Sequence, residues 1–449
     1  MVKMKRENHK DMREIGFGSS KVSGVKAFPF YLLAFLLLIA QGAFAVNVKT
    51  DRTWYLAGEA MTVRVTADDA VIAYAELCDT YGQAAGIMVS LQDGRGTGII
   101  ELPSNLHSGY YVLSVYTRNQ AEVSHQLVAV VNPLHKSKDD DMEWVEVTHP
   151  DSLSYPVADN SLSTINLPPS TLPVGVQEKE GHIIKARVKN VYEGHTFSGR
   201  QIRPSLSIIG KQIHYFEGKI VNDSIAVFYT FGLHGKQPLV LSAMSSTGMS
   251  LPIEIMSPFA TLLPKELPHL VFHYNRSEVE ARSLDMQRHQ IAITPAKREL
   301  QLGDNADDTA EEVVPLDYDE TVFGTMPDLT YNLDEYRQFL TIREVLLEYV
   351  LCVRKTTNNG IPQLIVRREQ DYYNSSLPSL VLIDGMPVQD VERLLNYDAR
   401  RIHYINIYGG QYTFGHSVYN GILSFVTRSG RLTNYPTEPN MQYLVYVFP

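Results

Sequence analysis

The chain has 449 residues, of which 44% are hydrophobic and 20% are charged, a composition that is ordinary for globular proteins. This length allows several domains of typical size, and the formal net charge of −10 argues against nucleic-acid binding. The two cysteines, Cys78 and Cys352, are too few for a disulfide framework or a zinc site, so we expect two free thiols.

The first segment has the pattern of a secretory signal peptide. Basic residues precede an apolar run at 28–40, and a small-x-small cleavage sequence, Ala-Phe-Ala, follows it at 43–45. The run is too short for a comfortable membrane span. We therefore expect a signal peptide at 1–45 that is cleaved before Val46, with an uncleaved anchor as the alternative. No later segment has the apolar length of a membrane-spanning helix.

Two regions then have the composition of β-sandwiches. Residues 46–132 contain short β-rich runs with partial alternation, punctuated by Gly- and Asn-rich turns. Residues 181–257 repeat this pattern and predict a second sandwich. Between them, 133–180 is charged and then rich in Ser, Thr and Pro, which is typical of a linker. We interpret its acidic run at 139–141 as solvated, because no calcium-ligand spacing accompanies it.

The C-terminal part begins with a connecting region at 258–333, which includes an acidic loop at 303–312. Residues 334–430 differ from everything before them, since helix and strand signals alternate. A capping box from Thr341 to Glu344 starts a predicted helix, a hairpin and a strand follow, and Asp390 can cap a second helix before two more strands. This order predicts a small α+β domain, followed by a tail at 431–449.

The order of elements around "LVLIDGMPV" resembles the plug domain of TonB-dependent outer-membrane receptors. In that family an apolar strand ends in Asp-Gly-x-Pro, a helix and a strand ending in Gly follow, and a Gly-initiated strand ending in Thr-basic-x-Gly closes the domain. The matching residues are Asp384, Gly385, Pro387, Gly409, Gly421, Thr427 and Gly430. The resemblance implies a plug-like domain. Because 19 residues follow Gly430, we expect it to lack a β-barrel of its own.

The N-terminal sandwich carries a second set of characteristic residues: Tyr55, Gly58, Glu59, Leu102, Pro103, Gly109 and Tyr110. At these positions it is similar to the MG2 domain of the α2-macroglobulin type. Neither cysteine lies in the Cys-Gly-Glu-Gln thioester that protease-trapping macroglobulins use, which excludes covalent trapping by this chain. The whole chain resembles exported envelope proteins of Gram-negative bacteria that combine an MG2-like domain with a plug-like domain.

The sequence contains no H-E-x-x-H, G-x-S-x-G or P-loop motif, so we expect no catalytic residue, cofactor or metal. We interpret Asp384 and Gly385 as a two-residue turn, since Asp384 as a catalytic acid would need a partner carboxylate. An aromatic group forms a candidate binding surface, with cross-strand packing as the other explanation. Its members are Tyr404, Tyr408, Tyr412, Phe414 and Tyr419.

Taken together, these patterns predict a multidomain, mainly β protein with two β-sandwiches followed by a small α+β plug-like domain. We expect a non-enzymatic binding or scaffold protein that is exported to the periplasm or outer membrane. Its expected partner is an outer-membrane protein or β-barrel, and nucleic acid is not expected. Two alternatives stay open: a solute-recognition component of TonB-linked nutrient uptake, and an envelope hydrolase.

Overall fold

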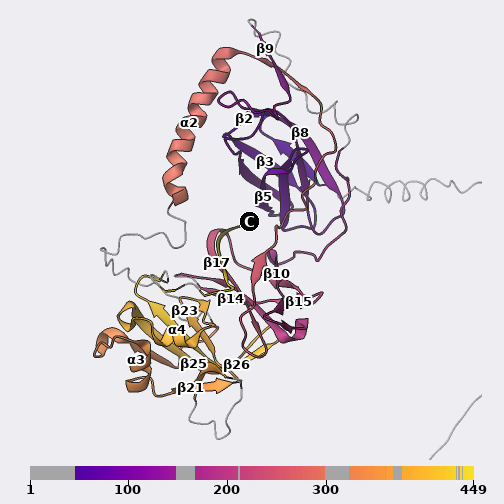
Figure 1. Ribbon diagram of the computed structural model, residues 1–449. Coiled ribbons are helices and arrows are strands. Elements are labelled where there is room, and N and C mark those ends of the chain that lie inside the picture. The colour runs from indigo at the N-terminus through magenta and orange to yellow at the C-terminus, as the bar shows by residue number, and fades with distance from the viewer. Residues whose placement is uncertain are drawn as a thin grey trace, which may run out of the picture. The chain divides into compact units, whose positions relative to one another are not determined.

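The computed structural model describes residues 46–147, 167–210, 213–298, 323–358, 360–367, 377–430, 432, 435–436 and 438–449 (Figure 1). The expected signal peptide at 1–45 and the acidic loop at 303–312 lie outside these residues. Strands dominate the described chain, which confirms the predicted multidomain, mainly β class. None of the described helices combines the length and the apolar character needed to cross a bilayer.

The first sandwich packs a three-stranded sheet against a five-stranded sheet. The smaller sheet has the order β1-β3-β6, with bounds Asn47–Thr50, Ala60–Thr66 and Arg95–Glu101. The larger has the order β2-β8-β7-β4-β5, with bounds Trp54–Leu56, Val123–Val131, Gly109–Tyr116, Ile72–Cys78 and Gln83–Ser90. Burial alternates along β3, because successive strand side chains point to opposite faces, and Met61, Val63 and Val65 enter the core.

Two segments that we expected to be a linker and a connecting region form structure on the side of the first sandwich. Met142–Glu146 (β9) pairs in parallel with Leu270–Tyr274 (β19), and the helix Arg276–Arg298 (α2) follows (Figure 1). Leu270 and Phe272 pack against Trp54 of β2. Local sequence could not show this pairing, because its two strands lie far apart in the chain.

The second sandwich consists of two four-stranded sheets. One has the order β15-β16-β10-β18, with bounds Lys219–Val221, Ile225–Tyr229, Ile183–Val188 and Ile253–Ile255. The other has the order β14-β13-β17-β27, with bounds His214–Glu217, Ile202–Ile208, Gly235–Ser245 and Gln442–Phe448. The segment expected as a C-terminal tail therefore supplies an edge strand, and Tyr446 and Phe448 of β27 enter the core of this sandwich. A short hairpin also belongs to this region, formed by Val191–Tyr192 (β11) and His195–Thr196 (β12).

The α+β region contains a mixed five-stranded sheet in the order β20-β25-β26-β23-β24. Its strands are Leu329–Asn332, Ile402–Phe414, Ser417–Thr427, Leu380–Ile383 and Met386–Pro387. One face packs on two short helices, Ile342–Glu348 (α3) and Val391–Leu395 (α4), and on the hairpin Val353–Asn358 (β21) and Ile361–Val366 (β22).

Both predicted helix caps of the α+β region are confirmed. The Thr341 hydroxyl accepts from the Glu344 N–H at 3.4 Å, while the Glu344 carboxylate accepts from the Thr341 N–H at 3.0 Å. The Asp390 carboxylate accepts from the N–H groups of Glu392 and Arg393 at 3.0 and 3.2 Å. Each cap satisfies backbone donors that the first helical turn leaves unpaired.

Candidate functional site

The Asp384-Gly385 turn is left-handed at both residues and holds a buried carboxylate. The φ angles are 47° at Asp384 and 87° at Gly385, and Asp384 is 1% exposed. Its carboxylate accepts from the Thr427 N–H at 2.7 Å, from the Thr427 hydroxyl at 2.5 Å and from the Leu432 N–H at 2.9 Å. Burial raises the pKa of Asp384, although these hydrogen bonds oppose the shift. The carboxylate therefore joins the end of β23 to the end of β26.

Gly385 is also fixed by a neighbour from the second sandwich. A Cβ atom there would lie 2.6 Å from Ile213 Cγ2 and 3.1 Å from the Ile208 carbonyl oxygen. Gly430 belongs to the same corner, because its N–H donates to the Thr427 hydroxyl at 3.0 Å. Positive φ alone favours glycine, and the close approach of β13 adds a second reason.

The remaining motif residues lie elsewhere in the sheet. Pro387, in β24, pairs with Leu382 of β23. Gly409 lies in a register shift of β25, and its N–H donates to the Asp328 carboxylate. Gly421, with φ of 81°, faces this shift from β26, and a Cβ there would lie 3.0 Å from the Tyr408 carbonyl oxygen. The motif thus forms one corner around Asp384 and one bulge.

The five aromatic residues of the candidate surface are not equally accessible. Four of them share one apolar cluster: Tyr408, Tyr412, Phe414 and Tyr419. Phe323 covers Tyr408 with ring centroids 5.0 Å apart, and Tyr215 of β14 contacts Phe414 at 5.1 Å. Tyr408 and Tyr419 are 0% and 8% exposed, so their rings are not open to a ligand. Tyr404 lies apart and half-buried, beside His403 at 3.9 Å.

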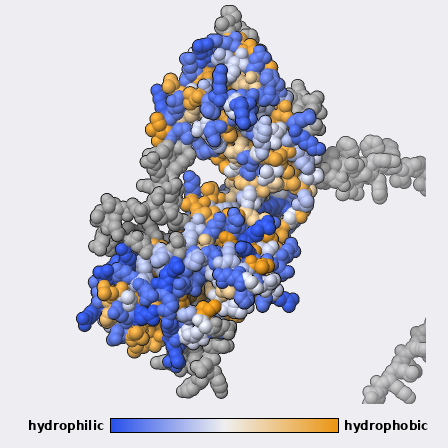
Figure 2. Space-filling view, viewed as in Figure 1, coloured by the Kyte–Doolittle hydropathy of each residue, from blue (hydrophilic) through white to orange (hydrophobic). Residues whose placement is uncertain are grey.

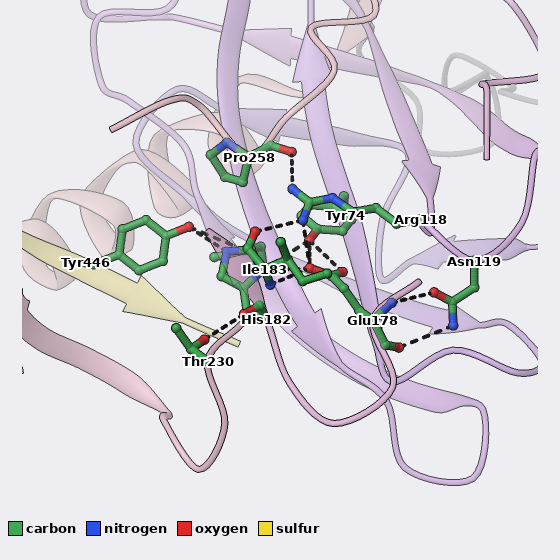
Figure 3. A network of polar contacts seen from close by, with 10 residues as sticks. Tyr74, Arg118, Asn119, Glu178, His182, Ile183, Thr230, Pro258 and Tyr446 are labelled. Atoms are coloured by element: carbon green, nitrogen blue, oxygen red, sulfur yellow. Dashed lines mark hydrogen bonds and ion pairs between the residues drawn. The ribbon is translucent and has the colours of Figure 1, made fainter. Parts of the chain in front are cut away.

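A buried polar network that the sequence analysis missed joins the two sandwiches (Figure 3). Its centre is the carboxylate of Glu178, which is 2% exposed. Glu178 accepts from the Tyr74 hydroxyl at 2.7 and 2.8 Å and from the Ile183 N–H at 2.8 Å, and it pairs with Arg118 at 2.8 Å. Tyr74 and Arg118 belong to the first sandwich, while Ile183 starts β10 of the second.

His182 extends the network to the C-terminal strand. Its Nδ1 lies 3.1 Å from Glu178, and its Nε2 lies 2.7 Å from the hydroxyl of Tyr446 in β27. Burial lowers the pKa of His182, so the ring is neutral at pH 7. In that state Nδ1–H donates to Glu178 and Nε2 accepts from Tyr446. The Thr230 hydroxyl donates to the His182 backbone carbonyl at 2.6 Å, which fixes the backbone that carries the imidazole ring.

The guanidinium of Arg118 compensates the buried charge. It donates to the carbonyls of Ile183 at 2.8 Å and Pro258 at 3.3 Å, and it lies 4.7 Å from the centre of the Tyr74 ring. Burial by itself raises the pKa of Glu178, but the hydrogen bond from His182 and the charge of Arg118 outweigh it. The pKa of Glu178 therefore lies below its usual value, and the carboxylate is ionised at neutral pH.

The order Tyr446, His182 and Glu178 has the connectivity of a proton relay. All three side chains are buried, with exposed fractions of 8%, 3% and 2%, and their polar atoms already bond one another. A substrate has no room beside them, so the network acts as a clamp between chain segments. The Glu178 and Tyr74 partners are 104 residues apart, and "VQEKEG" reads locally as a charged linker, so no sequence signal could have found them.

A second carboxylate, that of the half-buried Glu217, links β14 to the start of β26. Glu217 accepts from the Ser417 hydroxyl at 2.5 Å, and its other oxygen is buried without a hydrogen-bond partner. Beside it, the hydroxyls of Tyr215 and Tyr419 are 3.5 Å apart. Burial raises the pKa of Glu217 to about 7, because the hydrogen bond from Ser417 and the charge of Arg203 only partly offset desolvation.

Within the described residues, few observations support a metal site or a reactive cysteine. No group of three or more His, Cys, Asp or Glu side chains within them could hold a metal ion. Cys78 is buried and Cys352 is half-buried, and both are free thiols, as expected. Burial raises the pKa of Cys78 to about 12, so this thiol stays protonated and unreactive at neutral pH.

Comparisons with known proteins find only distant likeness. No family model matches the sequence, and no curated protein matches it. Among solved structures, Escherichia coli α2-macroglobulin activated by porcine elastase is 12% identical over 49% of this chain and 20% of that chain, with a TM-score of 0.17. A Salmonella α2-macroglobulin mutant is 11% identical over 47% of this chain and 14% of its own, with a TM-score of 0.18.

A tetra-tandem repeat from the extending region of a large adhesion protein is also similar, at 9% identity over 47% of this chain and 49% of that chain, with a TM-score of 0.15. The chain therefore spans about a fifth or less of the macroglobulin chains that it matches. At these TM-scores the chains do not superimpose as wholes, so the likeness supports no conclusion about activity or partners. Bacterial α2-macroglobulins are simply among the structures to which this mainly β chain is similar.

Proposed function

We propose that this chain is an exported, non-enzymatic binding or scaffold protein of the Gram-negative cell envelope that acts with an outer-membrane protein. The observation that supports this most directly is the Glu178 network. The charged and polar groups of this network bond to one another and join the two sandwiches and β27, so they do not face a substrate. Domains that are joined by a buried polar network keep fixed relative positions, which favours a role in holding partner proteins in place.

Two further features support the modular assignment. The signal-like pattern at 1–45 supports export. The Asp384-Gly385 turn, with its carboxylate bonded to Thr427, supports a plug-like C-terminal domain, and the first sandwich supports an MG2-like domain. On this proposal Asp384 has an architectural role, because its oxygens are already bonded to backbone and hydroxyl donors.

The test is crosslinking in intact cells that express the full chain with a C-terminal tag, followed by purification and identification of the bound proteins. We expect mature protein that begins at Val46 in the envelope fraction, crosslinked to an outer-membrane protein. The matched control replaces Leu36 and Leu37 in the apolar run with Asp, which should retain the chain in the cytoplasm. Recovery of the unaltered chain in the cytoplasm, or of envelope protein without an outer-membrane partner, would contradict the proposal.

A further inference from the structure

The face of the molecule shown in Figure 2 mixes small groups of hydrophobic residues with hydrophilic ones. A docking site for another protein is often marked by a larger exposed apolar patch. A site can also be filled by a segment of its own chain, and the first sandwich holds such a segment. Residues 257–263, which we call the strap, lie against its five-stranded sheet as an irregular chain between β18 and β19.

The sheet beneath the strap carries a buried carboxylate on its outer face. Ala75 and Leu77 of β4 enter the core of the sandwich, so Glu76 between them points to the opposite side, because strand side chains alternate. Glu76 is 0% exposed, and its carboxylate bonds two backbone N–H groups and, among the described residues, no cation. Burial raises the pKa of Glu76, although the two hydrogen bonds oppose the shift.

Three successive backbone N–H groups of the strap bond to side chains of the sheet. The Tyr116 hydroxyl accepts from the Ala260 N–H at 2.7 Å. The Glu76 carboxylate accepts from the Thr261 N–H at 3.0 Å and from the Leu262 N–H at 2.8 Å. The sheet therefore recognises the main chain of the strap, which any peptide of the same conformation also offers.

Two apolar side chains of the strap anchor it on either side of these bonds. The Phe259 ring lies 6.2 Å from the Tyr74 ring between centroids, and a Cβ atom on Gly86 would lie 2.9 Å from Cζ of Phe259. Leu262 is 7% exposed and shares an apolar cluster with Tyr74 and Tyr116. The two residues between the anchors are exposed. We call the surface under the strap the Glu76 face: Tyr74, Glu76, Gly86 and Tyr116.

Another segment docks on the first sandwich in a different way. Residues 170–172 bond through their backbone, since the Val123 N–H donates to the Ser170 carbonyl at 2.9 Å and the Leu172 N–H donates to the Ala121 carbonyl at 2.6 Å. The strap forms no backbone–backbone hydrogen bond with any described residue. Its release would therefore leave every strand pairing of the sheet intact, as the release of a bound peptide would.

The strap contains a strained residue at the point where it meets Glu76. Thr261 has a φ of 58°, in the left-handed region. Successive N–H groups converge on one anion when the backbone changes hand between neighbours, so this conformation lets two N–H groups reach the same carboxylate. A β-branched residue is strongly disfavoured there, whereas glycine adopts it freely. Strain of this kind is typical of ligand clamps and switch segments.

Glycine in place of Thr261 would keep the bonds to Glu76 and remove the strain. We infer that the Glu76 face binds a segment of a partner protein in which an aromatic residue, one further residue, glycine and an aliphatic residue follow one another, and that the strap fills this site until such a segment displaces it. A second copy of the chain carries the same strained threonine, so its strap would gain nothing over the one in place. The inference rests on the proposed binding or scaffold function and gives it a location.

The test is fluorescence anisotropy with labelled peptides and residues 46–449. The peptide SPFATLLP copies residues 257–264, and the peptide SPFAGLLP has glycine at the position of Thr261. We expect the glycine peptide to bind about tenfold more tightly, equivalent to about 1.4 kcal/mol. The peptide SPSAGSLP lacks both apolar anchors and should not bind. Equal binding of the first two peptides, or no binding by either, would overturn the inference.

Methylation of single peptide nitrogens tests the bonds to Glu76 without altering the protein. A methyl group on the nitrogen that corresponds to Leu262 removes one donor to the carboxylate and should weaken binding of the glycine peptide about tenfold. A methyl group on the nitrogen that corresponds to Leu263 is the matched control, since that N–H has no partner among the described residues. Equal effects of the two methyl groups would contradict recognition by Glu76.

Variants of the chain test the competition with the strap. Thr261→Gly should hold the strap more tightly and weaken binding of the glycine peptide about tenfold, whereas Phe259→Ser combined with Leu262→Ser should loosen the strap and strengthen binding. Asn222→Gly is the matched control, because Asn222 also has a left-handed φ, of 50°, in an exposed turn of the second sandwich. It should bind like the unaltered chain. Unchanged affinity in Thr261→Gly would mean that the strap does not occupy the peptide site.

Two further measurements separate this inference from its alternatives. In the crosslinking experiment, Thr261→Gly should capture less of the outer-membrane partner than Asn222→Gly, and equal capture would overturn this site while leaving the proposed function intact. Absence of any partner with the unaltered chain would contradict the proposed function itself. A dimer of the unaltered chain in light scattering that Thr261→Gly abolishes would show that a second copy fills the site, which would overturn the assignment to a partner.

Discussion

Glu178, which is buried, and Glu217, which is half-buried, lie at two junctions of the second sandwich, and their pKa values are shifted in opposite directions. Glu178, at the junction with the first sandwich, is paired with Arg118 and bonded to Tyr74 and His182, so its pKa is lowered. Glu217, at the junction with the α+β region, has one partnered oxygen and one buried oxygen without a partner, so its pKa rises to about 7. Burial alone therefore does not decide the charge of a carboxylate; its partners do.

The comparison implies that the charge of Glu178 stabilises the first junction, whereas the charge of Glu217 destabilises the second. Removing a partner at the first junction strands a buried ion, which is costly. Removing the charge at the second junction relieves a desolvation cost that the hydrogen bond from Ser417 and the charge of Arg203 offset only in part. The predictions that follow probe this contrast and the packing around the second junction.

The largest effect is expected for Arg118→Ala. The substitution leaves Glu178 ionised and buried without its cation, which should lower the free energy of unfolding by about 3–5 kcal/mol. Urea denaturation of residues 46–449, followed by fluorescence, measures this loss. Arg64→Ala on the exposed side of β3 is the control and should cost less than about 0.5 kcal/mol. A small effect of Arg118→Ala would mean that the first junction does not depend on the ion pair.

The next effect tests the second junction by steric means. Gly385→Val places a branched side chain at φ of 87°, where its Cβ would lie 2.6 Å from Ile213. Backbone strain and overpacking together should lower the free energy of unfolding by about 3 kcal/mol. Thermal unfolding checks this value. Gly360→Val is a matched control for strain alone, since Gly360 also has positive φ, at 83°, but has no atom within 4 Å of an added Cβ. Equal losses from the two variants would exclude a role for the contact with Ile213.

Asp384→Asn should cost about 1–3 kcal/mol, because an amide cannot accept all the hydrogen bonds that the carboxylate receives from Thr427 and Leu432. Turn chemistry alone predicts a mild effect, since Asn also tolerates positive φ. The structure changes that expectation, because the carboxylate is buried and bonded. Chemical denaturation decides between the two, and partner crosslinking should persist. Loss of partner binding at unchanged stability would refute the architectural role.

The smallest effect concerns pH. The folded pKa of Glu217, about 7, exceeds its unfolded value, so its contribution to stability is complete at acidic pH and is lost as the pH rises through about 7. Glu217→Gln should therefore be more stable than the unaltered chain at pH 8, by about 1–2 kcal/mol after allowance for solvent screening. It should also show a flatter pH dependence of stability between pH 5 and 8.

The pH dependence of stability that we expect from Glu178 has the opposite sign. Its lowered pKa means that its contribution is present at neutral pH and disappears as the pH falls through its folded pKa. Melting temperatures measured from pH 2 to pH 8 for the unaltered chain, Glu217→Gln and Arg118→Ala separate the two junctions. If Glu217→Gln and the unaltered chain lose stability equally between pH 5 and 8, the second junction does not titrate as described.

The sequence by itself determined the features whose partners lie within a few residues. The Thr341–Glu344 box and the Asp390 cap link residues no more than three positions apart, and the Asp384-Gly385 turn needs only two left-handed positions. The mainly β class also follows from local composition and alternation. For the two caps the energy comes from contacts between near neighbours, so a short stretch of sequence contains all the information; for the turn, sequence indicates the left-handed geometry but not the distant contacts with Thr427 and Ile213.

The tertiary structure alone decided which groups are buried and what they contact. Parity placed Tyr404 and Tyr408 on one side of β25, but only tertiary packing, with neighbours such as Leu382 and Phe323, made Tyr408 a core residue. The Glu178 network, the pairing of β9 with β19 and the edge position of β27 join segments far apart in the chain. Such contacts depend on the three-dimensional path of the backbone, and desolvation sets the charge of Glu178 and Glu217 only after that path has brought their partners close.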